Sequence, residues 1–226
     1  MKYLILIGDG MADFPLAEHG GRTPLELAHT PAMDDVVQRG LTGLYHPIPE
    51  ACAPGSDIGN LSLFGYDPRV TYTGRAPLEA ANQGITLAAD EVAFRCNVVT
   101  LEDGRMKDFT AGHISSEEAE ELIAALNADL GDSSVAFHAG VSYRHLAVVK
   151  AGAASATQLM GVACTPPHDI TGQTYKAYLP VGAGADIVRD LMARSEPILE
   201  HHPVNAARRN AGKSPATAIW LWGQGC

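Results

Sequence analysis

The amino-acid sequence predicts an α/β fold, because strand-type and helix-type patterns alternate along the first part of the chain. The apolar segment Tyr3–Ile7 is typical of a fully buried strand in a parallel sheet. A helical pattern follows, with Pro31 at the first helical position and Gly40 as its stop. Leu41–His46 is a candidate for the next strand. The 226 residues are 46% hydrophobic, which is enough for a sizeable core and excludes a disordered chain.

An acidic residue stands where the first predicted strand ends, in Gly8-Asp9-Gly10. In open α/β sheets the carboxyl ends of the strands are where ligands usually bind, so Asp9 is a candidate site residue. The alternative is an aspartate in an ordinary turn between two glycines. From this feature alone both interpretations stay open.

From about Gly74 onward, the pattern of apolar and polar residues differs from that of the first part of the chain. Val92–Thr100 alternates as a strand with one apolar face. Arg95 and Asn97 fall together on the other face, and their i, i+2 spacing makes them candidates for binding. The apolar face carries Val92, Phe94, Cys96 and Val98.

The rest of the chain predicts further helices and strands. A helix begins at Ser115, where Glu118 completes a capping box, and ends at Gly131. The small residues of Gly152–Thr157 predict a loop. The remaining predicted elements are strands at Tyr143–Lys150 and Ala216–Trp222, a helix through Ile187–Met192 that is interrupted or ended near Pro197, and a helix from Pro203 to Gly212.

The charge balance argues against nucleic acid as a partner. Lys and Arg total 16 against 26 Asp and Glu, a formal net charge of -10, so an overall basic footprint is absent. An anionic substrate requires only a local cationic pocket.

The cysteines and the N-terminus bear on the compartment. The four cysteines are scattered without a CxxC pair, which argues against a zinc ribbon and favours reduced thiols in the cytoplasm. The apolar run at the N-terminus is too short for a signal peptide or a membrane span, and no later segment is a candidate span.

Glycine spacing excludes three possible nucleotide-binding loops. Gly8-x-Gly10 and Gly182-x-Gly184 have Asp13 and Ile187 where a dinucleotide fingerprint needs its third glycine. Gly212-Lys213-Ser214 resembles the tail of a phosphate-binding loop, but Ala207 occupies its first glycine position.

Ser56 is a candidate nucleophile, although its surroundings do not match the GxSxG elbow of the α/β hydrolases. A helix is expected over Ile58–Phe64, and backbone N–H groups at a helix N-terminus attract phosphate. A serine there is placed to attack a phosphoryl group if a metal lowers its pKa. The alternative is an ordinary N-cap serine.

Nine segments of the chain, in the same order, resemble the archaeal-type 2,3-bisphosphoglycerate-independent phosphoglycerate mutases of the alkaline phosphatase superfamily. These segments span essentially the whole chain: Lys2–Asp13, Pro54–Pro68, Tyr72–Leu78, Ala93–Thr100, Ala111–Ser115, Gly140–His145, Pro166–Gln173, His202–Asn205 and Trp220–Gly225. The resemblance implies an alkaline-phosphatase-like α/β core interrupted by an inserted α+β substrate-binding domain. Residues 1–73 would be the first part of the split metal-binding catalytic domain, 74–215 the insert, and 216–226 a return strand toward the second half of the catalytic domain.

The same resemblance implies a cytoplasmic isomerase of glycolysis and gluconeogenesis that interconverts 3-phosphoglycerate and 2-phosphoglycerate. Ser56 matches the family's nucleophile, which forms a phosphoserine, and Asp9 matches a carboxylate that binds a metal beside it. Two divalent cations, manganese or magnesium, are implied, and 2,3-bisphosphoglycerate is not. The expected substrate-binding residues are Arg95, Asn97, His113, Arg144, His168 and Lys213.

One departure from the family pattern concerns the end of the chain. The family's pattern continues beyond WLWGQG with further Asp and His metal ligands, whereas this chain ends at Cys226. We therefore expect an N-terminal portion that binds metal weakly or not at all and has no mutase activity alone. Two alternatives stay open, namely a homoserine kinase-like phosphotransferase of the same family and a non-catalytic fragment that binds a phosphorylated acid.

Overall fold

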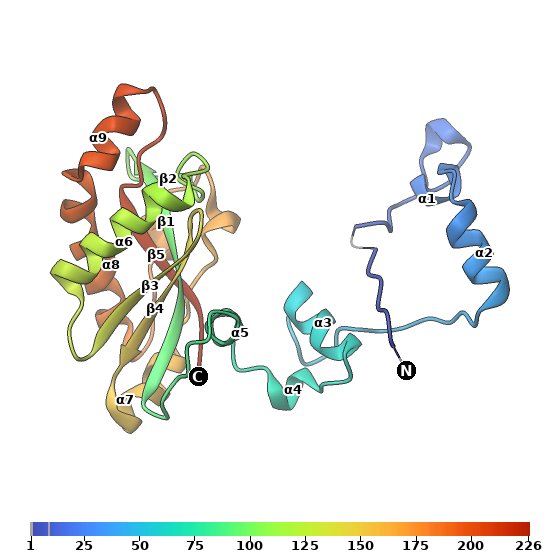
Figure 1. The fold of residues 1–226 in the computed structure, drawn as a ribbon, viewed down its shortest axis with the longest axis horizontal. Helices are drawn as coiled ribbons and strands as arrows, with labels where there is room; N and C mark the ends of the chain where they lie inside the picture. Colours follow the sequence, from blue (N-terminus) through green and yellow to red (C-terminus); the bar gives the residue numbers. More distant parts are fainter. Residues whose placement is uncertain (1, 9) are drawn as a thin grey trace. The chain divides into compact units, whose positions relative to one another are not determined.

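The computed structural model of the chain describes residues 2–8 and 10–226, without the side chains of residues 152–155. It divides into two compact units, Met1–His46 and Pro47–Cys226 (Figure 1). Mixed helices and an antiparallel sheet confirm the predicted combination of helix and strand. No helix in the described ranges has the length and apolar character that crossing a membrane requires.

In the unit Met1–His46, the described residues 2–8 and 10–46 form one 3₁₀ turn and two helices. They are η1 (Ala17–His19), α1 (Pro24–Leu27) and α2 (Pro31–Arg39), and α2 confirms the helix predicted from Pro31. The strands predicted at Tyr3–Ile7 and Leu41–His46 are wrong, because neither segment is extended into a ladder. Leu4 is 90% exposed, and among residues 2–8 and 10–46 no strand is present to pair with it. An apolar run becomes a strand only where a neighbour takes up its backbone hydrogen bonds.

The unit Pro47–Cys226 begins with three short helices and continues into a sheet. The helices are α3 (Ser56–Leu63), α4 (Pro68–Thr71) and α5 (Arg75–Asn82). The central strand is β1 (Glu91–Glu102), which pairs with β4 (Arg144–Lys150) and β5 (Ala218–Gly225). β3 (Val135–Val141) continues the sheet beyond β4, β2 (Arg105–Asp108) pairs with the end of β1, and every pairing is antiparallel. The strand predicted at Ala216–Trp222 is confirmed as β5 beside β1. Its role as a return strand toward the catalytic domain and the domain bounds at residues 73 and 215 stay predictions.

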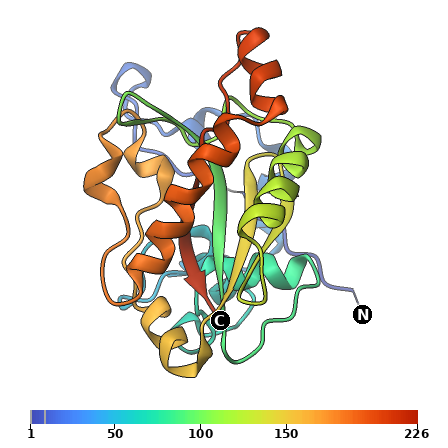
Figure 2. The same cartoon turned by 90° about the vertical axis from the view of Figure 1, so that its left-hand side faces the viewer.

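Helices cover the two faces of this sheet unequally. α6 (Ser116–Leu130) and α8 (Ala185–Glu200) pack on one face, as Figure 2 shows, and α5 packs on the other against Ala93 and Leu146. Ser115 caps α6 and forms the predicted capping box with Glu118. The remaining elements are α7 (Gly152–Met160), η2 (Pro167–Ile170), η3 (Tyr175–Tyr178) and α9 (Pro203–Asn210).

Two local predictions in this unit are wrong. Residues 152–157 lie within α7 and are not a loop, because alanine is a strong helix former. α8 continues through Pro197 to Glu200, so this proline does not end the helix.

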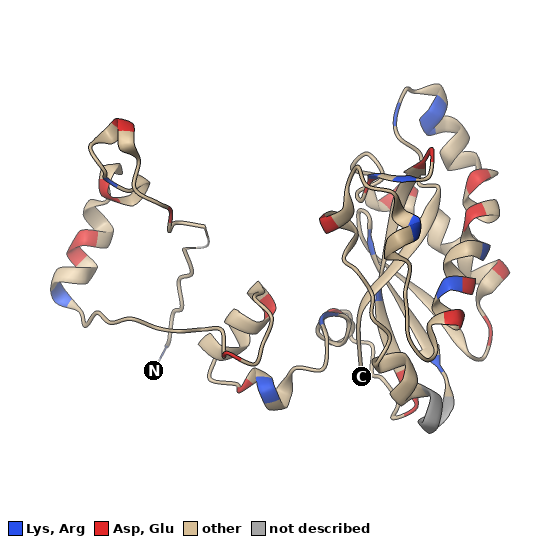
Figure 3. Cartoon of the chain, turned by 180° about the vertical axis from the view of Figure 1, so that it is seen from behind, with Lys and Arg blue, Asp and Glu red and all other residues tan. Residues whose placement is uncertain are grey.

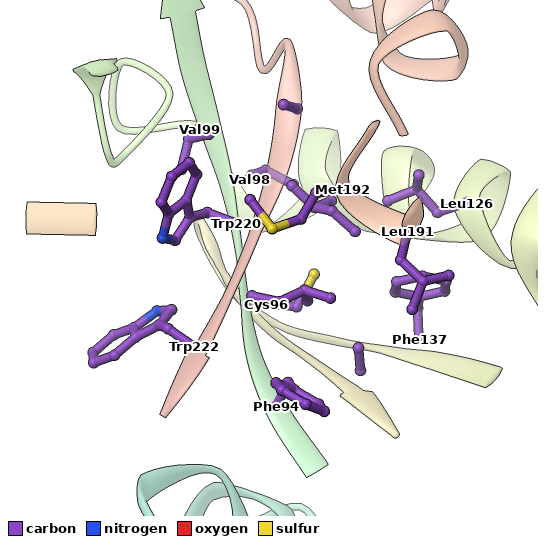
Figure 4. Packing of buried hydrophobic residues seen from close by; sticks show 14 of the residues in the cluster. Phe94, Cys96, Val98, Val99, Leu126, Phe137, Leu191, Met192, Trp220 and Trp222 are labelled. Atoms are coloured by element: carbon purple, nitrogen blue, oxygen red, sulfur yellow. The ribbon is translucent and has the colours of Figure 1, made fainter. Parts of the chain in front are cut away.

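The alternation predicted for β1 is confirmed by the packing. Phe94, Cys96 and Val98 are fully buried in the core beneath α6 and α8. Arg95 and Asn97 occupy the opposite face, where Trp222 and Trp220 are their cross-strand partners on β5. Figure 4 shows the two indoles on one side of these strands and Cys96 and Phe137 on the other.

His145 is a buried histidine on β4 that has no accessible surface. Its Nδ1 accepts a hydrogen bond from the Gly140 N–H at 3.0 Å, while Nε2 has no partner among the described residues. Burial lowers the pKa of His145 from 6.5 to about 4. The imidazole is therefore neutral in the folded protein at neutral pH.

Acidification is expected to destabilise the protein through His145. Above pH 6.5 the ring is neutral in both states, whereas below it the unfolded chain takes up a proton that the folded protein takes up only near pH 4. The free energy of unfolding should fall by about 2 kcal/mol between about pH 7.5 and pH 5 from this group alone. Urea denaturation of the wild type and of His145→Leu at both pH values measures this, since the variant lacks the titrating ring. Equal pH dependence of the two proteins would contradict the prediction.

Candidate active site

A hollow of about 590 Å³ lies within the unit Pro47–Cys226. The loop before α3 and the first turn of that helix form one wall, together with Tyr72. Arg75 at the start of α5, His168 in η2 and Trp222 on β5 line it from other elements. Its volume lies within the range of small-molecule sites, which run from about 300 to 1,000 Å³. The hollow is therefore the candidate active site.

Ser56 is the first residue of α3, and its side chain is exposed. Gly55, not Ser56, is the N-cap residue, so the interpretation of Ser56 as an ordinary N-cap serine is wrong. Gly55 and Asp57, the two neighbours of Ser56, both line the hollow. The first N–H groups of a helix have no partner within it, so an anion near Ser56 is favoured electrostatically.

Asp57 joins α3 to the start of α5. The Tyr72 hydroxyl donates a hydrogen bond to Asp57 Oδ2, and Arg75 Nε lies 3.7 Å from the same oxygen. Burial raises the pKa of Tyr72 above its ordinary value, and the hydrogen bond to Asp57 raises it further. Tyr72 therefore stays protonated and keeps donating to the carboxylate, which in turn holds Arg75 at the hollow.

Arg95 is the most enclosed cation near the hollow, with 8% of its side chain exposed. Its Nε lies 2.8 Å from Glu79 Oε1, which is an ion pair without the alignment of a hydrogen bond. Its guanidinium carbon lies 4.3 Å from the centre of the Trp222 ring, a cation–π contact. Burial lowers the pKa of Arg95 and Glu79 opposes that shift, but a guanidinium stays charged at neutral pH.

Asn97 and His168 contact the same tryptophan. The Trp222 indole N–H donates to Asn97 Oδ1 at 3.1 Å. The His168 ring packs on Trp222 with centroids 5.4 Å apart and planes at 69°. The structure therefore brings three predicted site residues, Arg95, Asn97 and His168, together around one indole.

Arg144 lies one strand away from this group. It is directly opposite Asn97 in the pairing of β1 with β4, so the two side chains share a face of the sheet. It lines a separate hollow of about 200 Å³ together with Glu79, the partner of Arg95. Figure 3 shows basic residues on the sheet and at the start of α5, where Arg75 begins the helix.

His113 and Lys213 lie on two loops that Arg208 joins. The buried Arg208 side chain donates to the carbonyl oxygens of Ala111 and Ser214, at 2.6 and 2.9 Å. His113 and Lys213 are exposed, and neither lines the larger hollow within residues 47–226. Their predicted contact with substrate stays a prediction.

The divalent cations that the resemblance implies need several ligating side chains in one place. In the part of the chain that the structure describes, no group of three His, Cys, Asp or Glu side chains is placed to hold a metal ion. Asp9, the predicted metal ligand, lies outside the described residues. The described residues therefore do not form a metal site by themselves, and the assignments of Asp9 and Ser56 as ligands stay predictions.

Sequence reasoning missed Arg75, Tyr72 and Trp222. All three stand in segments that carry the family resemblance, Tyr72–Leu78 and Trp220–Gly225, and that was the available signal. Their role depends on α5 lying on the sheet face that carries Arg95 and Asn97, and on Trp222 pairing with Arg95. Neither arrangement follows from local sequence patterns.

The chain is similar to known phosphoglycerate mutases both in sequence and in structure. The family model for 2,3-bisphosphoglycerate-independent phosphoglycerate mutase matches residues 37–205. A mutase of that name from Methanosarcina barkeri is 54% identical over 225 residues, which cover 100% of this chain and 55% of the relative. A probable mutase of that name from Geobacter sulfurreducens is 48% identical over 229 residues, which cover 100% of this chain and 56% of the relative.

A solved structure gives the same match. It is a cofactor-independent phosphoglycerate mutase from Thermoplasma acidophilum, with a TM-score of 0.59 and 29% identity over 96% of this chain and 57% of that chain. The present chain spans about half the length of the curated relatives that it matches.

Proposed function

The chain belongs to the family of 2,3-bisphosphoglycerate-independent phosphoglycerate mutases, and from this we propose that it supplies the substrate pocket and the phosphoryl-accepting serine of such an enzyme. The reaction is the interconversion of 3-phosphoglycerate and 2-phosphoglycerate, a step of glycolysis that a soluble cytoplasmic enzyme would perform. The family name specifies independence of 2,3-bisphosphoglycerate, so that compound has no part in the proposal.

One observation carries the proposal: the hollow joins the start of α3, where Ser56 stands, to cationic and aromatic residues of other elements. A phosphoglycerate carries a phosphate and a carboxylate, and each needs donors of hydrogen bonds. Arg75 faces the hollow, and its planar guanidinium suits either group. The N–H groups at the start of α3 suit the phosphate.

The proposed reaction consists of two phosphoryl transfers, the first to Ser56 Oγ and the second from it. Ser56 Oγ attacks phosphorus, the bond between phosphorus and the substrate oxygen breaks, and the Ser56 proton passes to that oxygen. The glycerate now has two free hydroxyls and reorients within the pocket. Its other hydroxyl then attacks the phosphorus of the phosphoserine, the bond between phosphorus and Ser56 Oγ breaks, and the proton of that hydroxyl passes to Ser56 Oγ. We propose that Asp9 and the divalent cations act at this serine, as the resemblance implies.

Binding of 3-phosphoglycerate to the 226-residue chain, measured by isothermal titration calorimetry, tests the proposal. Arg75→Met should weaken binding at least about tenfold, because a hydrogen bond to a charged group contributes about 1.5–3 kcal/mol. Arg194→Met is the matched control, since Arg194 is an exposed arginine of α8 that pairs only with Asp190 among the described residues. L-homoserine, which carries no phosphate, should not compete. Equal affinity in Arg75→Met and wild type would refute this pocket as the phosphoglycerate site.

A further inference from the structure

Trp222 contacts more residues of the candidate active site than any one of the predicted substrate-binding residues does. Its ring lies 4.3 Å from the Arg95 guanidinium and 5.7 Å from that of Arg75, measured from guanidinium carbon to ring centre. Its N–H donates to Asn97 at 3.1 Å, and His168 packs edge-on against it at 5.4 Å. Trp222 is 4% exposed and yet lines the hollow.

These contacts use different parts of the indole at the same time. The negative face of the ring attracts a guanidinium, whereas the polar N–H edge fixes an amide oxygen. A phenylalanine ring has the face without the N–H, and a leucine has neither. Tryptophan is therefore the side chain that holds both Arg95 and Asn97.

Backbone geometry keeps the indole in place. Trp222 is the direct cross-strand partner of Arg95 in the pairing of β5 with β1. Gly223 follows with φ of +60°, a conformation that favours glycine. A Cβ atom at Gly223 would lie 3.5 Å from Arg95 Cδ and 3.6 Å from Arg75 Cβ. These are ordinary van der Waals distances, so the positive φ, and not a lack of space, favours glycine at this position beside the two arginines.

We propose that Trp222 is a positioning residue that orders Arg95, Asn97 and His168 for the phosphorylated substrate. This inference rests on the proposed function of the hollow. Arg95 is an i, i+2 neighbour of Asn97 on β1, and His168 comes from η2, so no shared element aligns the three groups. The indole is the contact that they have in common. Ordering before binding lowers the entropic cost of immobilising these side chains on the ligand.

The first experiment measures this ordering without ligand, by NMR of the ¹⁵N-labelled 226-residue chain. In the wild type the Trp222 indole N–H should exchange slowly with solvent, and the Arg95 Nε–H should give a sharp signal. In Trp222→Leu the Arg95 signal should broaden or exchange faster, and in Trp222→Phe it should remain, because the ring face remains. Trp220→Phe is the matched control, since it removes the other tryptophan of the chain from the same strand.

The second experiment measures 3-phosphoglycerate affinity by calorimetry in the same variants. Trp222→Leu should weaken binding about tenfold or more, Trp222→Phe by a smaller factor, and Trp220→Phe not at all. In Trp220→Phe the only indole is Trp222, so its fluorescence should change on titration with 3-phosphoglycerate. This change shows that 3-phosphoglycerate binds beside Trp222, and the Arg95 signal and the affinities of the variants then decide whether the indole also positions Arg95.

The results test the positioning role of Trp222 and the proposed function of the hollow separately. If Trp222→Leu keeps both the wild-type Arg95 signal and the wild-type affinity, the positioning role is refuted. If the wild type does not bind 3-phosphoglycerate, the proposed function fails, and the ligand-free NMR still decides whether Trp222 orders Arg95. If Trp222→Leu does not fold, Trp222→Phe decides, because loss of the Asn97 contact should still lower affinity relative to Trp220→Phe.

Discussion

Replacing Ser56 by alanine is expected to lower mutase activity by about 1000-fold or more, the scale on which loss of a covalent nucleophile acts. The suitable protein is a fusion of residues 1–226 with the remaining part of the Methanosarcina barkeri relative, of which this chain covers 55%. Alanine removes the oxygen that accepts the phosphoryl group and leaves the start of α3 otherwise intact, since Gly55 and not Ser56 is the N-cap residue. The rate of 2-phosphoglycerate formation, coupled to its dehydration by enolase, measures the loss.

The control for this prediction is Ser62→Ala in the same helix. Ser62 Oγ is buried without a hydrogen-bond partner among the described residues, so its removal should leave the rate unchanged. Mass spectrometry of the active fusion after rapid acid quench should locate phosphate on Ser56. Full activity in Ser56→Ala would sink the assignment of the nucleophile, whatever the behaviour of Ser62→Ala.

Replacing Gly74 by alanine is expected to lower the free energy of unfolding by about 4 kcal/mol, from backbone strain and steric overlap together. Gly74 precedes α5 with φ of +154°, a conformation that side chains rarely adopt. A Cβ atom there would lie 2.0 Å from the carbonyl oxygen of Gln224, which belongs to β5. The nearest atoms are all backbone atoms of Gln224 and Gly225, so no flexible side chain can move aside.

Gly84→Ala is the matched control for Gly74→Ala. Gly84 also has a positive φ, +73°, but a Cβ atom there meets nothing within 4 Å. Its replacement should cost only about 1 kcal/mol, the ordinary penalty of the left-handed region. Urea denaturation followed by circular dichroism gives both values, and similar stabilities of the two variants would contradict the steric argument.

Local sequence patterns predicted the structure correctly where the conformation of a segment depends on residues close to it in the sequence. The alternation through Arg95 and Asn97 predicted which β1 residues face the core, and the pair of Ser115 and Glu118 predicted the start of α6. Both signals act within a few residues. For Ser56, the residues alone left a nucleophile and an ordinary N-cap serine both open, because no spacing rule separates the two at a helix start, and the family resemblance favoured the nucleophile.

Patterns failed where the outcome depends on distant neighbours. Tyr3–Ile7 has the composition of a buried strand, yet a strand needs partners, and none is present among residues 2–8 and 10–46. Arg75 was missed because its place at the hollow depends on α5 packing against the sheet face that carries Arg95 and Asn97. Trp222 was missed because only the register of β5 against β1 sets it over Arg95.

The pairing of β1 with β5 also determines when this site comes into existence. Asn97 and Trp222, which share a hydrogen bond, are 125 positions apart in the chain. During synthesis β1 leaves the ribosome long before β5, so Arg95 and Asn97 are made without the indole that orders them. Such distant pairings slow folding, because a long loop must close before the contact is gained. Competence to bind an anion should therefore appear late, together with closure of the sheet, and should serve as a reporter of completed folding.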